Sequence, residues 1–282
     1  MKKETIESYV LSLIDILGQK KELLKLNEVS SKPSTNQQEI QNIFNNTYGT
    51  IKKFRKHMNE AMEWLNKVRN ENKSHFNSNN LEVNSFSDLI TSYVSLRDNN
   101  DTIQFEGIFF LLFGNGLVFL QMLSEKKPLR GGIDIGLGIK HNNNEIYGNA
   151  LSKAYYLESK VSKSIRIVIG SSLYKYISDT ASADIESNDS VDYNIYWAKK
   201  CLEIIKQDVD KEYIINYLSK PFKEMEFFEY QYNNALNFIE LEMNKFKTQE
   251  KKKEFNMYYN TYTYLKSKES QEGNIQQNLE EK

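Results

Sequence analysis

The sequence has one cysteine, three histidines and almost no net charge, and each shortage excludes a class of protein. A single cysteine, Cys201, cannot form an internal disulfide bond. The histidines have no Cys or His neighbour at zinc-binding spacing, so they do not predict a zinc site. With 37 basic and 38 acidic residues, the net charge of −1 gives no global electrostatic reason to bind nucleic acid or an anionic membrane. Any anion site must be local.

Long apolar segments are also scarce. The nearest candidate for a membrane span, residues 107–123 (GIFFLLFGNGLVFLQML), is free of charge over 17 positions, which is the lower limit of spanning length. We expect a buried helix of a soluble core there, and no stable membrane insertion. The start, MKKETIESYV, leads into an apolar run that Asp15 interrupts, unlike the core of a signal peptide. These features predict a cytoplasmic protein.

The chain does contain enough apolar residues for a globular core, since 39% of its 282 residues are hydrophobic. Residues 9–17 predict a strand, and residues 18–27 have the spacing of a helix. Between residues 39 and 71, apolar side chains recur at three- and four-residue intervals, which predicts one long amphipathic helix. Residues 81–96 predict two short strands around a tight turn.

The alternation of strands and helices continues in the second half of the chain. Residues 102–125 predict an apolar helix, and residues 129–140 a glycine-rich strand whose small side chains let another backbone or a ligand approach. Residues 146–161 predict a helix, and residues 165–177 a strand followed by a short helix. Together these elements complete a βαββαβ unit. We therefore expect an α+β protein with a ferredoxin-like core into which the long helix is inserted.

The C-terminal part has a different pattern. Residues 201–218 look like a second hairpin, and residues 222–266 form a long, aromatic-rich helical segment. Its tyrosines, at helical spacing, favour a core or interface over stacking on nucleic-acid bases. We divide the chain into a domain at 1–219, a C-terminal helical extension at 220–266 and a polar, disordered tail at 267–282.

Asp15 and Asp88 belong to segments that this topology places side by side. In a ferredoxin-like sheet the first strand is antiparallel to the third, so the end of one lies beside the start of the other. Two carboxylates there could hold divalent cations through oxygen ligands. The residues after Asp15 open a helix whose N–H groups can receive phosphate oxygens. A structural alternative remains, in which Asp15 caps that helix and Asp88 occupies a turn.

Four segments, in this order, resemble one family: YVLSLIDILGQK, FSDLI, LRGGIDIG and IYGNALSKAYYLESK…IRIVIG. They resemble the class III nucleotidyl cyclases, most closely the pyrimidine cyclases of bacterial Pycsar antiphage systems, over roughly residues 9–170. The resemblance implies a class III cyclase core that converts a pyrimidine nucleoside triphosphate into its 3′,5′-cyclic monophosphate with release of pyrophosphate. UTP is the expected substrate. It also implies two Mn²⁺ or Mg²⁺ ions per site and a homodimer with composite active sites.

The resemblance also implies roles for particular residues near the end of the first strand. Asp15 and Asp88 would be metal ligands, together with the backbone carbonyl of Ile16. The backbone amides of Leu17 and Gly18 would face the phosphates of the substrate.

The chain departs from the family on the helix after the glycine-rich strand. Typical members have G-x-x-V-N-x-A-x-R-L-E there, and this chain has Ser152 and Tyr156 at the Asn and Arg positions. The family's Arg stabilises charge on the phosphoryl group in flight, so turnover needs a substitute cation. Arg130, Lys153 and Lys160 are the candidates. Two hypotheses stay open: an active cyclase, or a catalytically degenerate cyclase fold that binds a nucleotide or a partner protein for regulation.

Overall fold

The computed structural model describes residues 5–30, 37–71, 81–86, 89–97, 105–141, 145–183 and 189–280. The elements of the first half are β1 (Ile6–Ile16), α1 (Gln19–Ser30), α2 (Gln37–Asn46), α3 (Tyr48–Glu71), β2 (Glu82–Phe86), β3 (Leu89–Ser95), α4 (Phe105–Ser124) and β4 (Leu129–Lys140). The second half has β5 (Ile146–Gly148), α5 (Asn149–Tyr156), the π-helical turn η1 (Leu157–Val161), β6 (Ile167–Ile169), α6 (Ser171–Ala181), α7 (Asp189–Glu203), β7 (Ile205–Gln207), β8 (Tyr213–Ile215), α8 (Lys220–Lys223), α9 (Phe228–Thr248) and α10 (Lys252–Glu280).

Within the described residues, eight strands form one mixed sheet in the order β2-β3-β1-β4-β6-β8-β7, with β5 paired to β4. β1 is antiparallel to both β3 and β4, and β2 is antiparallel to β3. This is the ferredoxin-like arrangement that the sequence predicts, and the α+β fold class is confirmed. The βαββαβ unit is already complete at β4. β6 then joins β4 in parallel, and the β7–β8 hairpin, also expected from the sequence, extends the sheet.

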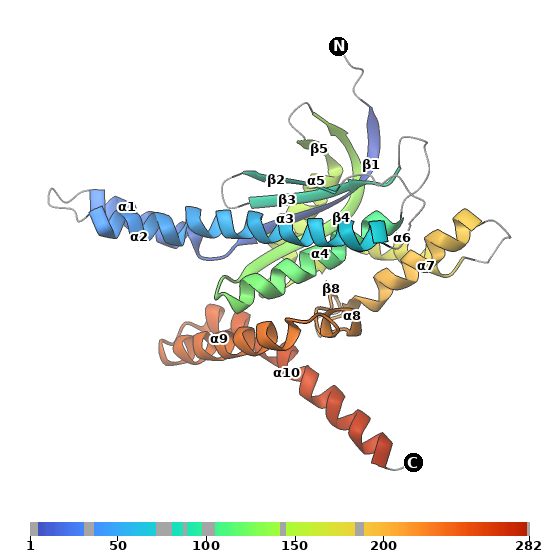
Figure 1. Cartoon of the computed structure of the whole chain (residues 1–282). Helices are drawn as coiled ribbons and strands as arrows, with labels where there is room; N and C mark the ends of the chain where they lie inside the picture. The colour runs from blue at the N-terminus through green and yellow to red at the C-terminus, as the bar shows by residue number, and fades with distance from the viewer. Residues whose placement is uncertain are drawn as a thin grey trace.

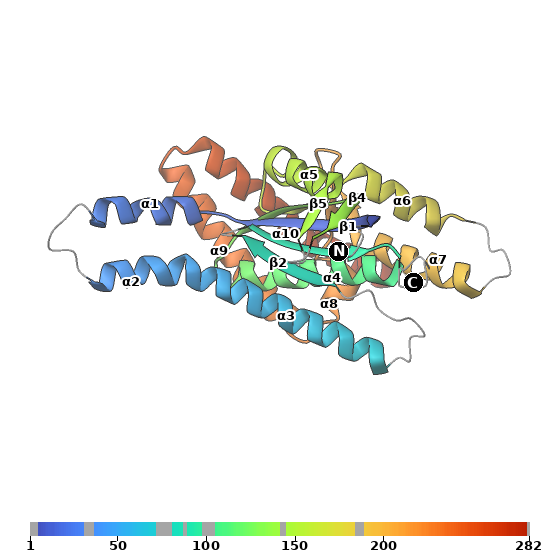
Figure 2. The same ribbon diagram turned by 90° about the horizontal axis from the view of Figure 1, so that it is seen from above.

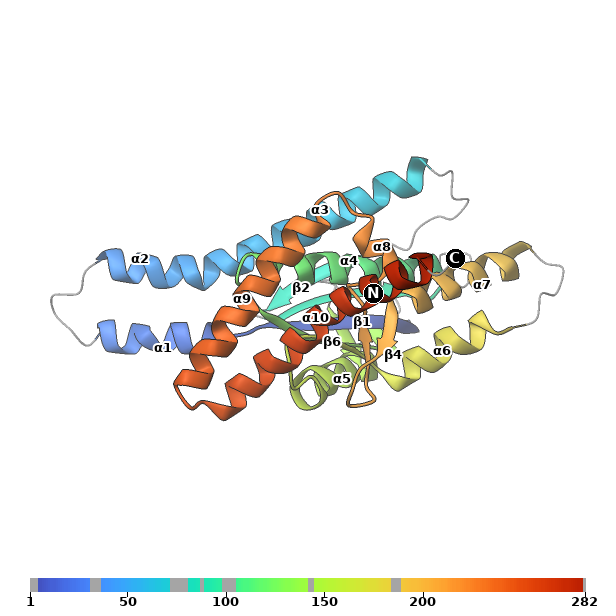
Figure 3. The ribbon, with the colours of Figure 1, turned by 90° about the horizontal axis from the view of Figure 1, so that it is seen from below.

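The two faces of the sheet carry different layers. α4 covers one face, and α3, α7 and α9 pack against α4 in turn. α5 lies on β1 and β4 from the opposite face, so that β1 runs between α4 and α5 (Figures 1 and 2). Figure 3, a view from below, shows α9 and α10, which pack against each other on this side of the molecule. The α4 side holds the larger hydrophobic core, and the α5 side holds a small separate cluster around Leu11 and Leu13.

α4 is the apolar helix expected at 102–125. It is long and apolar enough to cross a membrane, but 67% of its most apolar window is buried inside the protein. A buried polar contact sets its position: the Asn115 side chain donates hydrogen bonds to Ser92 Oγ (3.0 Å) and the Leu111 carbonyl (2.7 Å) and accepts one from Ser12 Oγ (3.1 Å). Because unpaired polar groups are costly in a core, this contact ties α4 to β1 and β3 in one register.

The single long helix predicted at 39–71 is wrong, because the structure divides it into α2 and α3 at Thr47. The Thr47 hydroxyl donates to the Ile43 carbonyl (2.8 Å), and the Thr50 hydroxyl to the Asn46 carbonyl (2.7 Å). Such side chains compete for the carbonyls that a continuous helix uses, and Gly49 adds a weak helix former.

Two other predictions need correction. The helix expected at 146–161 begins only at Asn149, since Ile146–Gly148 forms β5 and Gly148 adopts a φ of 154°, which disfavours other residues. The tail expected to be disordered at 267–282 is helical through Glu280, as a continuation of α10. Its Gln, Glu and Lys residues favour a helix, and it follows a segment that is packed up to the buried Lys268.

Candidate active site

Two charged residues meet where β1 and β4 run side by side. Asp15, near the end of β1, pairs in the ladder with Arg130 at the start of β4. Residues directly opposite each other in an antiparallel ladder point to the same face, and Arg130 Nη2 lies 3.3 Å from Asp15 Oδ2. The Asp15 side chain is 20% exposed, so water or an ion can reach it. The aspartate predicted to bind metal is therefore held beside a cation of its own chain.

Glu158 contacts the same guanidinium from η1. Arg130 donates to Glu158 Oε1 through Nε (2.7 Å), and its Nη2 atom lies 2.6 Å from the same oxygen. The Glu158 side chain is only 4% exposed, so its charge requires a partner inside the protein. π-helical turns are frequent at functional sites. We call Asp15, Arg130 and Glu158 the charged cluster.

Glycines of β4 allow α5 and η1 to lie directly on the sheet. A Cβ atom at Gly132 would lie 2.6 Å from the Ala154 carbonyl oxygen and 2.8 Å from the Glu158 nitrogen. One at Gly136 would lie 2.7 Å from the Ala150 nitrogen. The prediction that small side chains on this strand admit another backbone is thus confirmed.

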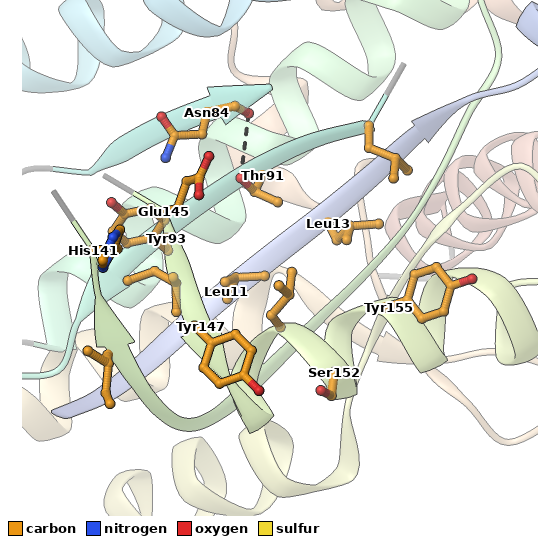
Figure 4. A pocket seen from close by; sticks show the side chains of 14 residues that line it. Leu11, Leu13, Asn84, Thr91, Tyr93, His141, Glu145, Tyr147, Ser152 and Tyr155 are labelled. Atoms are coloured by element: carbon orange, nitrogen blue, oxygen red, sulfur yellow. Dashed lines mark hydrogen bonds between the residues drawn. The ribbon is translucent and has the colours of Figure 1, made fainter. Parts of the chain in front are cut away.

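An open groove of about 960 Å³ extends along the same sheet face (Figure 4). It is lined by Leu11, Leu13, Asn84, Leu89, Thr91, Tyr93, Ile139, His141, Glu145, Ile146, Tyr147, Leu151, Ser152 and Tyr155. Leu11 and Leu13 belong to its apolar side on β1, and Tyr147 and Tyr155 are exposed. Because Asp15 is the next residue after Leu13 on this face of β1, the charged cluster lies beyond the Leu13 end of the groove.

One polar group within the groove is held in its neutral form. Burial raises the pKa of Tyr93 far above its ordinary value, and its hydroxyl donates to Glu82 (2.7 Å). Tyr93 is therefore a hydrogen-bonding wall of the groove and not a base.

Ser152 and Tyr156, predicted as catalytic, both lie on α5. Ser152 lines the groove, and its hydroxyl donates to the Gly148 carbonyl one turn back (3.3 Å). Tyr156 is exposed, two positions before Glu158. The structure thus brings Ser152 to the groove and leaves the Tyr156 ring in solvent.

Lys153, another cation proposed from the sequence, points toward α6, and Lys160, the third, is exposed on η1. Its Nζ atom donates to the Ile135 carbonyl (3.0 Å) and to Ser172 Oγ (3.1 Å). Asp134 of β4 lies near Lys153, and its carboxylate accepts a hydrogen bond from the Leu173 amide at the start of α6 (3.0 Å). Burial raises the pKa of Asp134, an effect that nearby Lys153 opposes. No hydrogen bond that the structure gives for its described residues joins Lys153 to the charged cluster.

The backbone after Asp15 follows the prediction only in part. The Leu17 amide donates to the Pro128 carbonyl (3.0 Å), so the expectation that this amide faces a phosphate is wrong. It fails because the antiparallel pairing of β1 with the start of β4 continues past Ile16. Gly18 has a φ of 91°, and its carbonyl accepts the Glu22 amide (3.2 Å), which starts α1. The roles given to Gly18 and to the Ile16 carbonyl remain predictions.

Asp88 lies outside the described residues. The following residue, Leu89, is directly opposite Asp15 in the β1–β3 ladder. The predicted pairing of the first strand with the third is thus confirmed, and the second carboxylate remains a prediction.

The charged cluster suits a divalent cation in its chemistry. Within the described ranges, no three His, Cys, Asp or Glu side chains converge as metal ligands. Asp15 and Glu158 nonetheless both contact one cation, the Arg130 guanidinium, so the site favours positive charge. A carboxylate such as Asp15 is also the oxygen ligand that Mn²⁺ and Mg²⁺ prefer.

The sequence did not indicate that Glu158 binds Arg130 or that Asp134 accepts the Leu173 amide at the start of α6. Glu158 stands at the final Glu of the family pattern, and that match was the available signal. Its contact with Arg130 depends on a π-helical turn, which apolar periodicity does not indicate.

Neither a protein-family model nor a curated protein matches the sequence. Among solved structures, the chain is similar to the monomeric guanylyl cyclase domain of the RhoGC fusion protein from the aquatic fungus Blastocladiella emersonii, at 14% identity and a TM-score of 0.38, over 76% of this chain and 98% of that one. It is also similar to a class III adenylyl cyclase-like ATP-binding protein from Pseudomonas aeruginosa, at 14% identity and a TM-score of 0.41, over 70% of this chain and 40% of that one. At such distances, the residues of this chain must carry the assignment of function.

Proposed function

We propose that the protein is a metal-dependent nucleotidyl cyclase that converts a pyrimidine nucleoside triphosphate into its 3′,5′-cyclic monophosphate and pyrophosphate. The proposed substrate is UTP. The observation that carries the proposal is the charged cluster at one end of an open groove on a ferredoxin-like sheet. The groove offers apolar surface for a base and sugar. The Arg130 guanidinium, with its planar set of donors, suits the phosphate oxygens.

Asp15 is the residue of the described chain best suited to hold a metal ion, with Asp88 and the Ile16 carbonyl as the other expected ligands of a two-ion site. Mn²⁺ or Mg²⁺ bound there would lower the pKa of the ribose 3′-hydroxyl and offset phosphate charge. Arg130 would orient the triphosphate, since it is itself held by the buried Glu158. The 3′-oxygen would attack the α-phosphorus and pass its proton to solvent water, and the new oxygen–phosphorus bond would replace the bond from the α-phosphorus to the departing pyrophosphate.

A homodimer with composite sites is part of this proposal. Tyr147 and Tyr155 line the groove with exposed rings, and Tyr156 is exposed on the same helix as Tyr155. A second copy that covered this face would bury these rings and bring its own Ser152 and Tyr156 toward the substrate. Light scattering at micromolar protein should give twice the chain mass, and a monomer that Mn²⁺ and UTP leave unchanged would exclude composite sites.

The decisive experiment is incubation with each of the four ribonucleoside triphosphates and Mn²⁺, followed by chromatography. A cyclic pyrimidine nucleotide plus pyrophosphate is the expected result, with UTP the best substrate. Asp15→Asn is the negative control, because it keeps the side-chain shape and removes the charge. A purine product would refute the pyrimidine assignment and leave the cyclase assignment intact.

A degenerate cyclase fold that binds a nucleotide or a partner protein for regulation is the second candidate. Ser152 and Tyr156 replace the family's Asn and Arg, and Lys153 is engaged with Ile135 and Ser172. Nucleotide binding in calorimetry without any product in the same assay would select this function.

The biological role follows from the resemblance: a cytoplasmic enzyme whose cyclic pyrimidine nucleotide is an alarm signal in Pycsar antiphage defence. Bacteria that carry the gene with its neighbouring genes should survive phage challenge better than bacteria with the Asp15→Asn version. Equal survival would separate the enzyme from this role.

A further inference from the structure

The contacts of Arg130 with its two carboxylates are unequal. Its Nη2 atom lies 2.6 Å from Glu158 Oε1 and 3.3 Å from Asp15 Oδ2, and its Nε atom also donates to Glu158 (2.7 Å). The guanidinium is therefore bound mainly by Glu158, and its contact with Asp15 is the longer one.

Burial makes the same distinction. Glu158 is almost completely enclosed, and a buried carboxylate that loses its cation is strongly destabilised, so Arg130 should stay on Glu158. Asp15 is more exposed, and another cation or water can replace its longer contact at little cost.

We propose that Glu158 is a positioning residue: it binds Arg130 more closely than Asp15 does, so the guanidinium lies beside Asp15 in the metal-free site but gives up that contact to a divalent cation while it stays on Glu158. This inference rests on the proposed function, because it needs Asp15 to bind a metal ion. The site would then keep a positive charge beside Asp15 before the metal arrives. Metal affinity is set by competition with Arg130.

Glu158→Gln separates a positioning role from a folding role, because it keeps the shape of the side chain and removes the negative charge that Arg130 contacts most closely. Among the described residues, Asp15 is then the carboxylate that the structure places in contact with Arg130. Mn²⁺ alone, titrated by calorimetry without nucleotide, should bind about threefold to tenfold more weakly than to the wild type. A control, Glu203→Gln, removes one carboxylate from an exposed ion pair on α7 and should leave Mn²⁺ affinity unchanged.

The double variant Arg130→Gln with Glu158→Gln removes the competing cation without leaving a lone buried charge. It should bind Mn²⁺ about threefold to tenfold more tightly than the Glu158→Gln single variant. Arg55→Gln, at an exposed position of α3, is the control for the loss of one positive charge. Thermal melts in EDTA verify that each variant is folded.

Three outcomes overturn the inference. If Glu158→Gln binds Mn²⁺ as well as the wild type does, Glu158 does not position Arg130. If the double variant binds more weakly than the single one, Arg130 supports the metal ion and does not compete with it. If the wild type itself binds no Mn²⁺, the inference fails together with the metal-dependent cyclase, whereas either of the first two results leaves the cyclase standing.

Discussion

The two faces of the same sheet differ in how completely they are covered. On the α4 side, helices pack on helices and the apolar core is closed. On the α5 side, α5 and η1 cover part of β1 and β4, and an open groove and the charged cluster lie on the same face. Neighbouring residues of β1 thus serve different ends: Ile14 is buried in the core, and Asp15 remains accessible. We therefore expect the α4 face to govern stability and the α5 face to govern ligand binding and turnover.

The largest effect is expected from the closed face. Phe119→Ala should lower the free energy of unfolding by about 3–5 kcal/mol, because Phe119 is 1% exposed and its loss leaves a cavity. Phe44→Ala, at a position of α2 that is 45% exposed, is the matched control and should cost less than about 1 kcal/mol. Urea denaturation measures both. Equal losses would mean that the α4 face is no more important for stability than a peripheral helix.

Asp15→Asn should reverse this pattern on the open face. We expect turnover to fall by about 100-fold or more and the Mn²⁺-dependent rise in melting temperature to disappear, because hard cations need anionic oxygen ligands. Metal-free stability should change by less than about 1 kcal/mol, since Arg130 keeps its contacts with Glu158. The sequence predicts the same loss for Asp88→Asn. Melts with and without Mn²⁺ decide: an undiminished metal shift would return Asp15 to a structural role.

Gly132→Ala tests the contact that joins the open face to its helix. The added methyl would meet backbone atoms of α5 and η1, so we expect a loss of about 1–3 kcal/mol in unfolding free energy. Gly49→Ala in α3 is the control, because its Cβ would meet nothing closer than 3.9 Å, and it should stabilise by up to about 1 kcal/mol. Chemical denaturation of both variants provides the comparison, and a neutral Gly132→Ala would refute the tight packing of α5 on β4.

The ion cluster at the β7–β8 turn should respond to pH where the apolar core does not. Arg166 is buried and hydrogen-bonds Asp208 and Asp210 (both 2.5 Å), and its hydrogen bond lowers the pKa of Asp210. The ionised carboxylate therefore stabilises the fold above the unfolded pKa of about 3.9, and this stability is lost as pH falls through the lower folded pKa.

Asp210→Asn should accordingly flatten the decline in unfolding free energy below about pH 4. The exposed Asp179, replaced in the same way, is the control and should leave the acid limb as steep as in the wild type. Denaturant titrations at several acidic pH values measure the slope. If both variants keep the wild-type slope, Arg166 does not act through Asp210.

The smallest effect on stability is expected for Tyr147→Ser. Its ring is 80% exposed, so the free energy of unfolding should change by less than about 0.5 kcal/mol. If a second copy covers the groove, the variant dimer should nonetheless dissociate at a higher protein concentration than the wild-type dimer. Sedimentation over a range of concentrations would measure this difference. An unchanged dimer would place the interface elsewhere.

Apolar periodicity was enough to predict the strands at 9–17 and 129–140, the hairpin at 81–96 and the apolar helix at 102–125, because each pattern is local and matches one burial environment. It failed at Thr47, where side-chain hydroxyls compete for helix carbonyls, and in the tail, which continues a packed helix. At the candidate site, the expected strand order indicated Asp15, and the family resemblance indicated Arg130. Neither argument predicted that the two side chains touch.

Local patterns of apolar and polar residues were sufficient to predict most strands and helices and to place a carboxylate at the end of the first strand. Which of these residues come into contact depends on how the strands and helices pack in three dimensions. The β1–β4 register places Arg130 opposite Asp15, and a π-helical turn brings Glu158 to the same guanidinium. Shifting that register by one residue would turn every side chain of the strand to the other face, so the contact depends on long-range pairing that no local pattern contains.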